Sequence, residues 1–125
     1  MIRGIGIDIV YISRILKILQ KYEEKFLNKI YTKQEIEISR KYKSQKIRAK
    51  YFAKRFAAKE AFVKALGSGF SQGITMKDIE IYSDSKGKPY LTISKDFISK
   101  DYILHLSLSD DGDYAIAFVI ICNDR

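Results

Sequence analysis

The sequence predicts an α+β fold in which an antiparallel sheet packs against one long central helix and shorter helices. Three observations predict it: residues 2 to 10 alternate as a strand does, the chain up to residue 66 repeats its apolar residues at helical spacing, and strand-like segments follow from residue 79. The chain has 125 residues, of which 46% are hydrophobic. We therefore expect a single domain over residues 1–125.

The first strand carries a carboxylate among glycines. Its isoleucines at positions 5, 7 and 9 point to one face. The residues expected on the other face are Gly4, Gly6, Asp8 and Val10. Because glycines have no side chain, another element can approach the backbone closely beside Asp8.

Helical segments follow directly. Apolar residues recur over 12–19, with Ser13 as a possible N-cap, and over 26–30. Thr32 and Glu35 match a capping box and should open another helix. Residues 46–66 then read as one long helix, which the segment Gly67-Ser68-Gly69 should end.

The second half of the chain reads mainly as strands. A strand with Ile79 and Ile81, a turn over 85–89 and a strand over 90–93 form a first pair. A short helix is expected over 94–102, capped by Ser94. Strands over 103–109 and 114–122 form a hairpin across residues 110–113.

Charge and composition limit the classes of function. The chain carries 23 Lys and Arg against 15 Asp and Glu, a net charge of +8 that indicates an anionic partner. Its single cysteine, Cys122, excludes an internal disulfide and fits a reducing, cytoplasmic location. No apolar run reaches the ~18 residues of a membrane span, so no membrane association is expected.

The long helix contains the most informative residue, Glu60. At helical spacing, Glu60 borders an apolar stripe, where a carboxylate is costly unless something compensates its charge. A surface ion pair with Lys64, four residues on, is the simplest explanation. Asp8 could likewise cap a helix or pair with a lysine. Two such carboxylates with lysines nearby instead suggest a divalent cation that holds a phosphate.

Other candidates have plain explanations as well. The capping box accounts for Glu35. His105, the only histidine, alternates onto the polar side of its strand, where it is either solvated or a base near pH 7. Lys88 follows Gly87 in a turn that is solvated or presents a fixed cation to a phosphate.

Four segments together resemble a known family. They are Gly4-Ile5-Gly6-Ile7-Asp8-Ile9-Val10, the helix core from Arg55 to Gly69, the strand 78–81 with Gly87-Lys88-Pro89, and His105-Leu106-Ser107-Leu108-Ser109. In this order they resemble the holo-[acyl-carrier-protein] synthases, the small bacterial 4′-phosphopantetheinyl transferases. The likeness covers almost the whole chain, and the run Phe-Ala-Ala-Lys-Glu-Ala-Phe-Val-Lys is its most specific part.

This resemblance implies an enzyme of fatty acid biosynthesis. Such enzymes move the 4′-phosphopantetheine group of coenzyme A onto a serine of apo acyl carrier protein, which yields the holo form and adenosine 3′,5′-bisphosphate. Positioning and charge neutralisation dominate this chemistry, and a divalent metal supplies part of both. By resemblance, Asp8 and Glu60 are the Mg²⁺ ligands, and coenzyme A oxygens and water complete the shell.

Further roles follow from the same resemblance. Lys64 lies near the phosphates, while Lys88 and the segment Gly67, Ser68 and Gly69 contact the nucleotide part of coenzyme A. His105 lies near the site, where it either orients a group or takes the serine proton. Glu35 is the rival candidate for that base and would act through water. Asp110 stands where relatives often have a second histidine, which puts a role for that position in doubt.

The resemblance also implies protein partners. Arg14, Lys17 and Lys21 would dock the acidic acyl carrier protein. The family forms homotrimers with sites shared between adjacent subunits. Two other functions compete. A nucleic-acid-binding module fits the charge, but no RNP, KH or helix-turn-helix signature appears, so no nucleic acid is expected. An inactive carrier-binding protein conflicts with the presence of both carboxylates and both core lysines.

Overall fold

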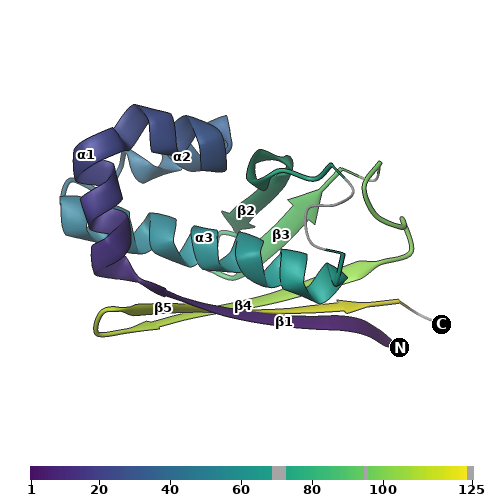
Figure 1. Ribbon diagram of the computed structural model, residues 1–125. Coiled ribbons are helices and arrows are strands. Elements are labelled where there is room, and N and C mark those ends of the chain that lie inside the picture. The colour runs from purple at the N-terminus through teal and green to yellow at the C-terminus, as the bar shows by residue number, and fades with distance from the viewer. Residues whose placement is uncertain (69–72, 95, 124–125) are drawn as a thin grey trace.

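The computed structural model describes residues 1–68, 73–94 and 96–123. It confirms the α+β fold, with a central helix between a sheet and the smaller elements (Figure 1). In chain order the elements are β1 (Ile2–Tyr11), α1 (Ile12–Ile30), α2 (Lys33–Ser39), α3 (Gln45–Leu66), a 3₁₀ turn η1 (Met76–Asp78), β2 (Ile79–Ser83), β3 (Pro89–Ile93), β4 (Ile103–Asp111) and β5 (Tyr114–Cys122).

The strands form two antiparallel sheets. The larger has the order β1-β5-β4, so the N-terminal strand pairs with the last one, and Asp8 lies opposite Ala117. The smaller sheet is the β2–β3 hairpin. Helix α3 lies along one face of the larger sheet (Figure 1). Helices α1 and α2 and the β2–β3 hairpin lie on the side of α3 that faces away from this sheet.

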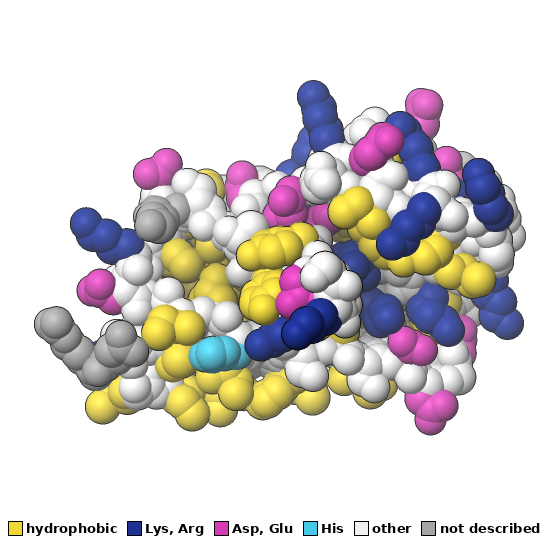
Figure 2. All heavy atoms as spheres, turned by 180° about the vertical axis from the view of Figure 1, so that it is seen from behind, with side chains coloured by type: hydrophobic (Ala, Val, Ile, Leu, Met, Phe, Trp, Pro, Cys, Tyr) yellow, Lys and Arg dark blue, Asp and Glu magenta, His cyan; other side chains and the backbone are white. Residues whose placement is uncertain are grey.

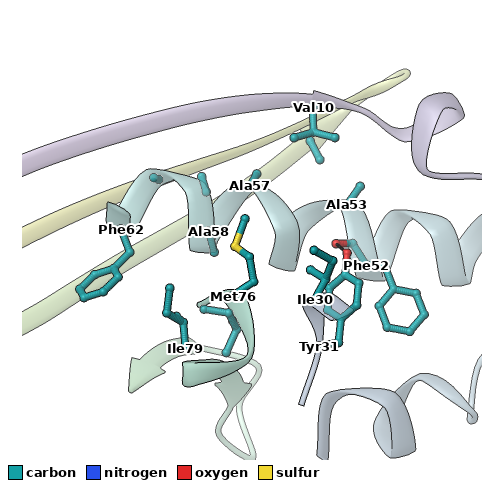
Figure 3. Close-up of a cluster of buried hydrophobic side chains, with 14 of the residues drawn as sticks. Val10, Ile30, Tyr31, Phe52, Ala53, Ala57, Ala58, Phe62, Met76 and Ile79 are labelled. Atoms are coloured by element: carbon teal, nitrogen blue, oxygen red, sulfur yellow. Dashed lines mark hydrogen bonds between the residues drawn. The ribbon is translucent and has the colours of Figure 1, made fainter. Parts of the chain in front are cut away.

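Small residues let α3 approach the larger sheet closely. Ala53 and Ala57 of α3 point toward the strands, whereas Phe52 and Phe62 point toward the smaller elements (Figure 3). A Cβ atom added at Gly4 would lie 1.9 Å from the Ala65 carbonyl oxygen. One added at Gly6 would lie 1.8 Å from the Ala61 carbonyl oxygen. The glycines expected to admit a close neighbour therefore do so, and the neighbour is the backbone of α3.

Helix α1 is one element with a kink. The two expected stretches join at Tyr22, whose backbone is not helical (φ −140°, ψ 40°). The proposed Ser13 N-cap is wrong, because the helix begins at Ile12 and Tyr11 is its N-cap residue. A residue from the other end of the chain, Asp113, accepts the Ser13 N–H instead.

The helix expected over 94–102 is also wrong. The described residues of that segment form turns, in which the Phe97 N–H donates to the Ser94 carbonyl and the Tyr102 N–H donates to the Ser99 carbonyl. The other expected elements are present, and the β4–β5 hairpin turns more tightly than expected, at Gly112 and Asp113. Among the described residues, no helix has the length and apolarity needed to cross a membrane.

Candidate functional site

The edge of the larger sheet at β1 brings the two predicted metal ligands together. Asp8 lies on the inner side of β1, and Glu60 and Lys64 come from the last turns of α3, which the glycines hold against this strand. Lys64 Nζ donates to Asp8 Oδ1 at 3.0 Å and to the Ile7 carbonyl at 3.1 Å. Lys64 therefore crosses to the strand and forms with Asp8 the lysine pair that was one explanation for this carboxylate.

The charges of Glu60, Asp8 and Lys64 affect one another. Partial burial raises the pKa of Glu60 above its usual value, and the negative charge of Asp8 raises it further, while Lys64 opposes both effects. Two carboxylates that repel each other, one of them partly desolvated, are stabilised by a shared cation. A cavity of about 330 Å³ opens beside them, lined by Ile7, Asp8, Ile9, Lys64 and Ile116.

This donor set fits Mg²⁺ bound together with a phosphate. In the described part of the chain, no three His, Cys, Asp or Glu side chains gather into one group. Mg²⁺ commonly takes only one or two protein carboxylates and fills its other positions with water and substrate phosphate oxygens. Asp8 and Glu60 therefore suit a metal that a phosphorylated substrate helps to hold.

A second, larger cavity of about 510 Å³ lies at the opposite edge, beside β4. Helix α3, the start of its preceding loop, the β2–β3 turn and Leu108 of β4 line it. Its deepest cation is Arg55, which is 8% exposed, and the guanidinium carbon lies 3.8 Å from the centre of the Tyr51 ring. Arg55 Nε is buried and has no hydrogen-bond partner among the described residues.

Arg55 was missed by the sequence reasoning. The available signal was an arginine four residues after Tyr51 and directly before Phe56, Ala57 and Ala58 in the long helix. A buried guanidinium with a free donor is costly unless a ligand satisfies it. Lys41 and Lys54 also line the cavity, so it suits an anion with an aromatic or apolar portion.

The β2–β3 turn that carries Lys88 borders this second cavity through Gly87 and Pro89. Asp84 fixes the turn, since its Oδ1 accepts the backbone N–H groups of both Lys86 and Lys88 at 2.9 Å. The Lys88 N–H bond is the main cause of the lowered pKa of Asp84. The cation expected to meet a phosphate thus stands on a well-ordered turn.

The structure separates other residues that the sequence reasoning grouped together. Gly67 and Ser68 follow the C-terminal end of α3, with Gly67 in the left-handed conformation (φ 79°), and neither lines the cavity beside the turn that carries Lys88. Gly69 lies outside the described residues. The predicted nucleotide-contacting residues therefore fall into two groups, one directly after α3 and one on the β2–β3 turn.

His105 lies on β4, on the outer face of the larger sheet. It pairs with Ile120 of β5, which in turn lies opposite Ile5 of β1, whereas Asp8 points to the inner face. At β1 this outer face is strongly apolar: Ile5, Ile7 and Ile9 are each more than half exposed, at 55%, 58% and 57%. Figure 2 shows apolar side chains along the lower border of the molecule, where this sheet lies.

Glu35 lies apart from both cavities. Its carboxylate is fully buried, and its Oε1 accepts Lys59 Nζ at 2.7 Å while its Oε2 accepts the Ile81 N–H at 2.7 Å. The capping box with Thr32 is present as expected. Because every observed partner of Glu35 is a structural one, we assign it to the core and leave it out of the catalytic proposal. The partner Lys59 was not anticipated.

The three predicted docking cations share one exposed side of α1. Arg14, Lys17 and Lys21 recur at intervals of three and four residues and are all exposed. No ion pair with a described acidic side chain neutralises them. They therefore form an uncompensated positive stripe on the surface.

Residues 4–119 match the model of the 4′-phosphopantetheinyl transferase superfamily. The chain belongs to this superfamily. The holo-[acyl-carrier-protein] synthase of Wolbachia pipientis subsp. Culex pipiens (strain wPip) is 80% identical over 98% of both chains. That of Ehrlichia ruminantium (strain Gardel) is 56% identical over 97% of both.

Solved structures of the superfamily have the same fold. The Bacillus anthracis holo-(acyl-carrier-protein) synthase in complex with CoA (3′,5′-ADP) has a TM-score of 0.83 and 39% identity, over 97% of this chain and 96% of that one. The Helicobacter pylori holo-[acyl-carrier-protein] synthase in complex with coenzyme A has a TM-score of 0.82 and 34% identity, over 94% and 99%. Sequence identity of 34–39% over almost the whole of both chains indicates more than a shared fold.

Proposed function

We propose that this member of the 4′-phosphopantetheinyl transferase superfamily is a holo-[acyl-carrier-protein] synthase of fatty acid biosynthesis. The serine Oγ of apo acyl carrier protein attacks the phosphorus that bears the pantetheine arm of coenzyme A. The pyrophosphate P–O bond breaks, adenosine 3′,5′-bisphosphate leaves and the serine proton is released. The names and the coenzyme A complexes of its relatives support this assignment.

One observation carries the proposal: β1 and α3 meet so that Lys64, one turn after Glu60, bonds to Asp8 at 3.0 Å, which gathers two carboxylates and a cation at one place. We assign these carboxylates to Mg²⁺, which, when bound, neutralises phosphate charge as the leaving group departs. Lys64, already paired with Asp8, supplies a further positive charge at the phosphates. The chain's own residues thereby concentrate positive charge where the reaction develops negative charge.

The cavity at Arg55 is our candidate for the nucleotide end of coenzyme A. The buried Arg55 Nε, which has no partner among the described residues, and the lysines around it suit phosphate, and the tyrosines of the cavity suit a base ring. The turn bearing Lys88 stands at the same cavity. We place the adenine ring and the 3′-phosphate at this cavity, while the pyrophosphate that reacts lies at the carboxylates.

These two regions lie on opposite edges of one chain, which supports a site shared between copies. Asp8 belongs to the edge strand β1, Leu108 of the second cavity belongs to the edge strand β4, and α3 lies between them. His105 faces the other side of the sheet from Asp8, so it too would reach the carboxylates only from another copy. The exposed apolar sheet face offers the surface for this assembly, which we propose is a homotrimer.

The positive stripe of Arg14, Lys17 and Lys21 supports docking of an acidic acyl carrier protein. Together with the lone cysteine and the net charge of +8, this fits an enzyme that works on a cytoplasmic carrier.

The test is mass spectrometry of apo acyl carrier protein after incubation with the enzyme, coenzyme A and Mg²⁺. We expect a gain of one phosphopantetheine group, prevented by EDTA and by Asp8→Asn or Glu60→Gln. No gain, with a known synthase active on the same carrier, would overturn the proposed function. Transfer that persists in both variants would overturn the metal assignment alone.

A further inference from the structure

The β4–β5 turn holds the first turn of α1 from across the molecule. The Asp113 carbonyl accepts the Ile12 N–H at 2.8 Å. The Asp113 carboxylate accepts the Ser13 N–H at 2.9 Å through Oδ1 and the Ser13 Oγ–H at 2.6 Å through Oδ2. Tyr11 and Tyr114, the residues that precede α1 and follow the turn, also pack with ring centroids 5.1 Å apart.

Helix α1 lacks the usual means of stabilising its own beginning. Its N-cap residue, Tyr11, makes no side-chain capping bond, and its first turn contains no acidic residue. The nearest charge in the helix is instead the cation of Arg14, which is unfavourable beside the positive end of a helix dipole. Asp113, one hundred residues away in the chain, provides both the missing acceptor and the missing negative charge.

We propose that Asp113 is a positioning residue for carrier docking. By capping α1 it fixes the turn from which Arg14 projects, and with it the start of the positive stripe that Lys17 and Lys21 continue. This inference rests on the proposed function, because it assigns that stripe to the acidic carrier. Asp113 itself contacts neither the carboxylate site nor the Arg55 cavity among the described interactions.

The loss of the cap and the loss of a negative charge predict opposite effects on carrier binding when Asp113 is replaced. Loss of a negative charge near a cationic docking surface should, by electrostatics alone, strengthen binding of an acidic carrier. Loss of the cap should weaken it, because the first turn of α1 must be ordered again at each docking event. The direction of the change in KM for the carrier therefore distinguishes the two.

The turn offers matched controls. Asp111→Ala removes the same charge from an exposed side chain that has no described partner in α1. Asp113→Asn removes the charge of Asp113 but keeps an acceptor for the Ser13 N–H, and asparagine caps helices about as well as aspartate. Comparing Asp113→Ala with Asp113→Asn thus isolates the cap at constant net charge.

The experiment measures KM for apo acyl carrier protein and for coenzyme A, together with exchange of the Ser13 amide in the free enzyme. We expect Asp113→Ala to raise the carrier KM about threefold or more and to speed Ser13 exchange, with the coenzyme A KM unchanged. Asp113→Asn and Asp111→Ala should not raise the carrier KM. Equal carrier KM values for the two Asp113 variants would overturn the inference. A wild-type enzyme without transfer would overturn the proposed function itself, and the docking role with it.

Discussion

Lys59 Nζ lies 2.7 Å from Glu35 Oε1, and neither side chain is exposed to solvent. The same ammonium group donates to the carbonyls of Ile30 and Met76. One lysine of α3 therefore ties together the end of α1, the start of α2 and the 3₁₀ turn before β2. Burial lowers the pKa of Lys59, and the nearby Glu35 carboxylate opposes this. The Lys59–Glu35 pair therefore holds α1, α2 and the 3₁₀ turn against the central helix α3.

Breaking this pair should be costly. We expect Lys59→Met to lower the free energy of unfolding by ~3–5 kcal/mol, because it leaves the Glu35 carboxylate buried without a counter-ion. Adding Glu35→Gln to that variant should restore part of the loss by removing the stranded charge. Urea denaturation at one fixed protein concentration measures both changes.

The exposed pair between Arg40 and Glu37 is the control for this experiment. Arg40→Met should change stability by less than ~1 kcal/mol. If the double variant at Lys59 and Glu35 is less stable than Lys59→Met alone, the buried charge is not the source of the cost.

Because the pKa of Glu60 is raised, stability without Mg²⁺ and the stabilisation added by Mg²⁺ should change with pH in opposite directions. Between the usual pKa of a glutamate and the raised value, the folded protein holds a proton that the unfolded chain has released, so stability should fall as pH rises through this window. Mg²⁺ needs both carboxylates ionised, so the extra thermal stabilisation that Mg²⁺ adds to the coenzyme A complex should grow over the same window. Thermal melts with and without Mg²⁺ measure both trends.

Glu60→Gln is the matched variant for these melts. It should remove the fall in stability with pH and the added effect of Mg²⁺, while it keeps or slightly raises stability near neutral pH, because a partly buried, repelled charge is gone. An undiminished Mg²⁺ effect in this variant would refute Glu60 as a ligand.

The cavity at Arg55 should determine affinity for coenzyme A. Arg55→Met removes a buried donor that has no partner in the described chain, and we expect the KM for coenzyme A to rise ~10-fold or more. The KM for the carrier should not change. Lys46→Met, at an exposed position of the same helix, removes the same charge away from the cavity and should leave both constants near wild type. Similar effects of the two substitutions would indicate a general charge effect.

Subunit sharing can be tested by mixing inactive partners. Asp8→Asn leaves the Arg55 cavity intact, and Arg55→Met leaves the carboxylates intact. If one copy supplies each part, mixed oligomers should recover transfer at low coenzyme A concentration beyond the sum of the two variants alone. Activity equal to that sum, in a sample shown to exchange subunits, would place a complete site within one chain.

Local patterns predicted much of this molecule. Alternation placed Asp8 on the glycine face of β1, and the capping box placed the start of α2. The predictions failed where residues distant in the sequence determine the local structure. Ser13 resembles an N-cap, but Asp113 from the last hairpin provides the acceptor. Glu35 was explained locally, and only the fold reveals Lys59 as its partner, 24 residues away.

The residues of the candidate site also differ in how far the sequence predicts them. The two carboxylates were found because charges in apolar patterns are visible in the sequence. Arg55 was not, because its importance depends on a cavity built from α3, the β2–β3 turn and β4 together.

The contact between β1 and α3 has a consequence for how the site tolerates change. Carbonyl oxygens of Ala61 and Ala65 occupy the space that side chains at Gly6 and Gly4 would need. The backbone of β1 therefore packs directly against the backbone of α3. This contact fixes the distance between Asp8 and Glu60. Core side chains elsewhere could be exchanged without altering that spacing. Gly4 and Gly6 could not, although neither has a functional group of its own.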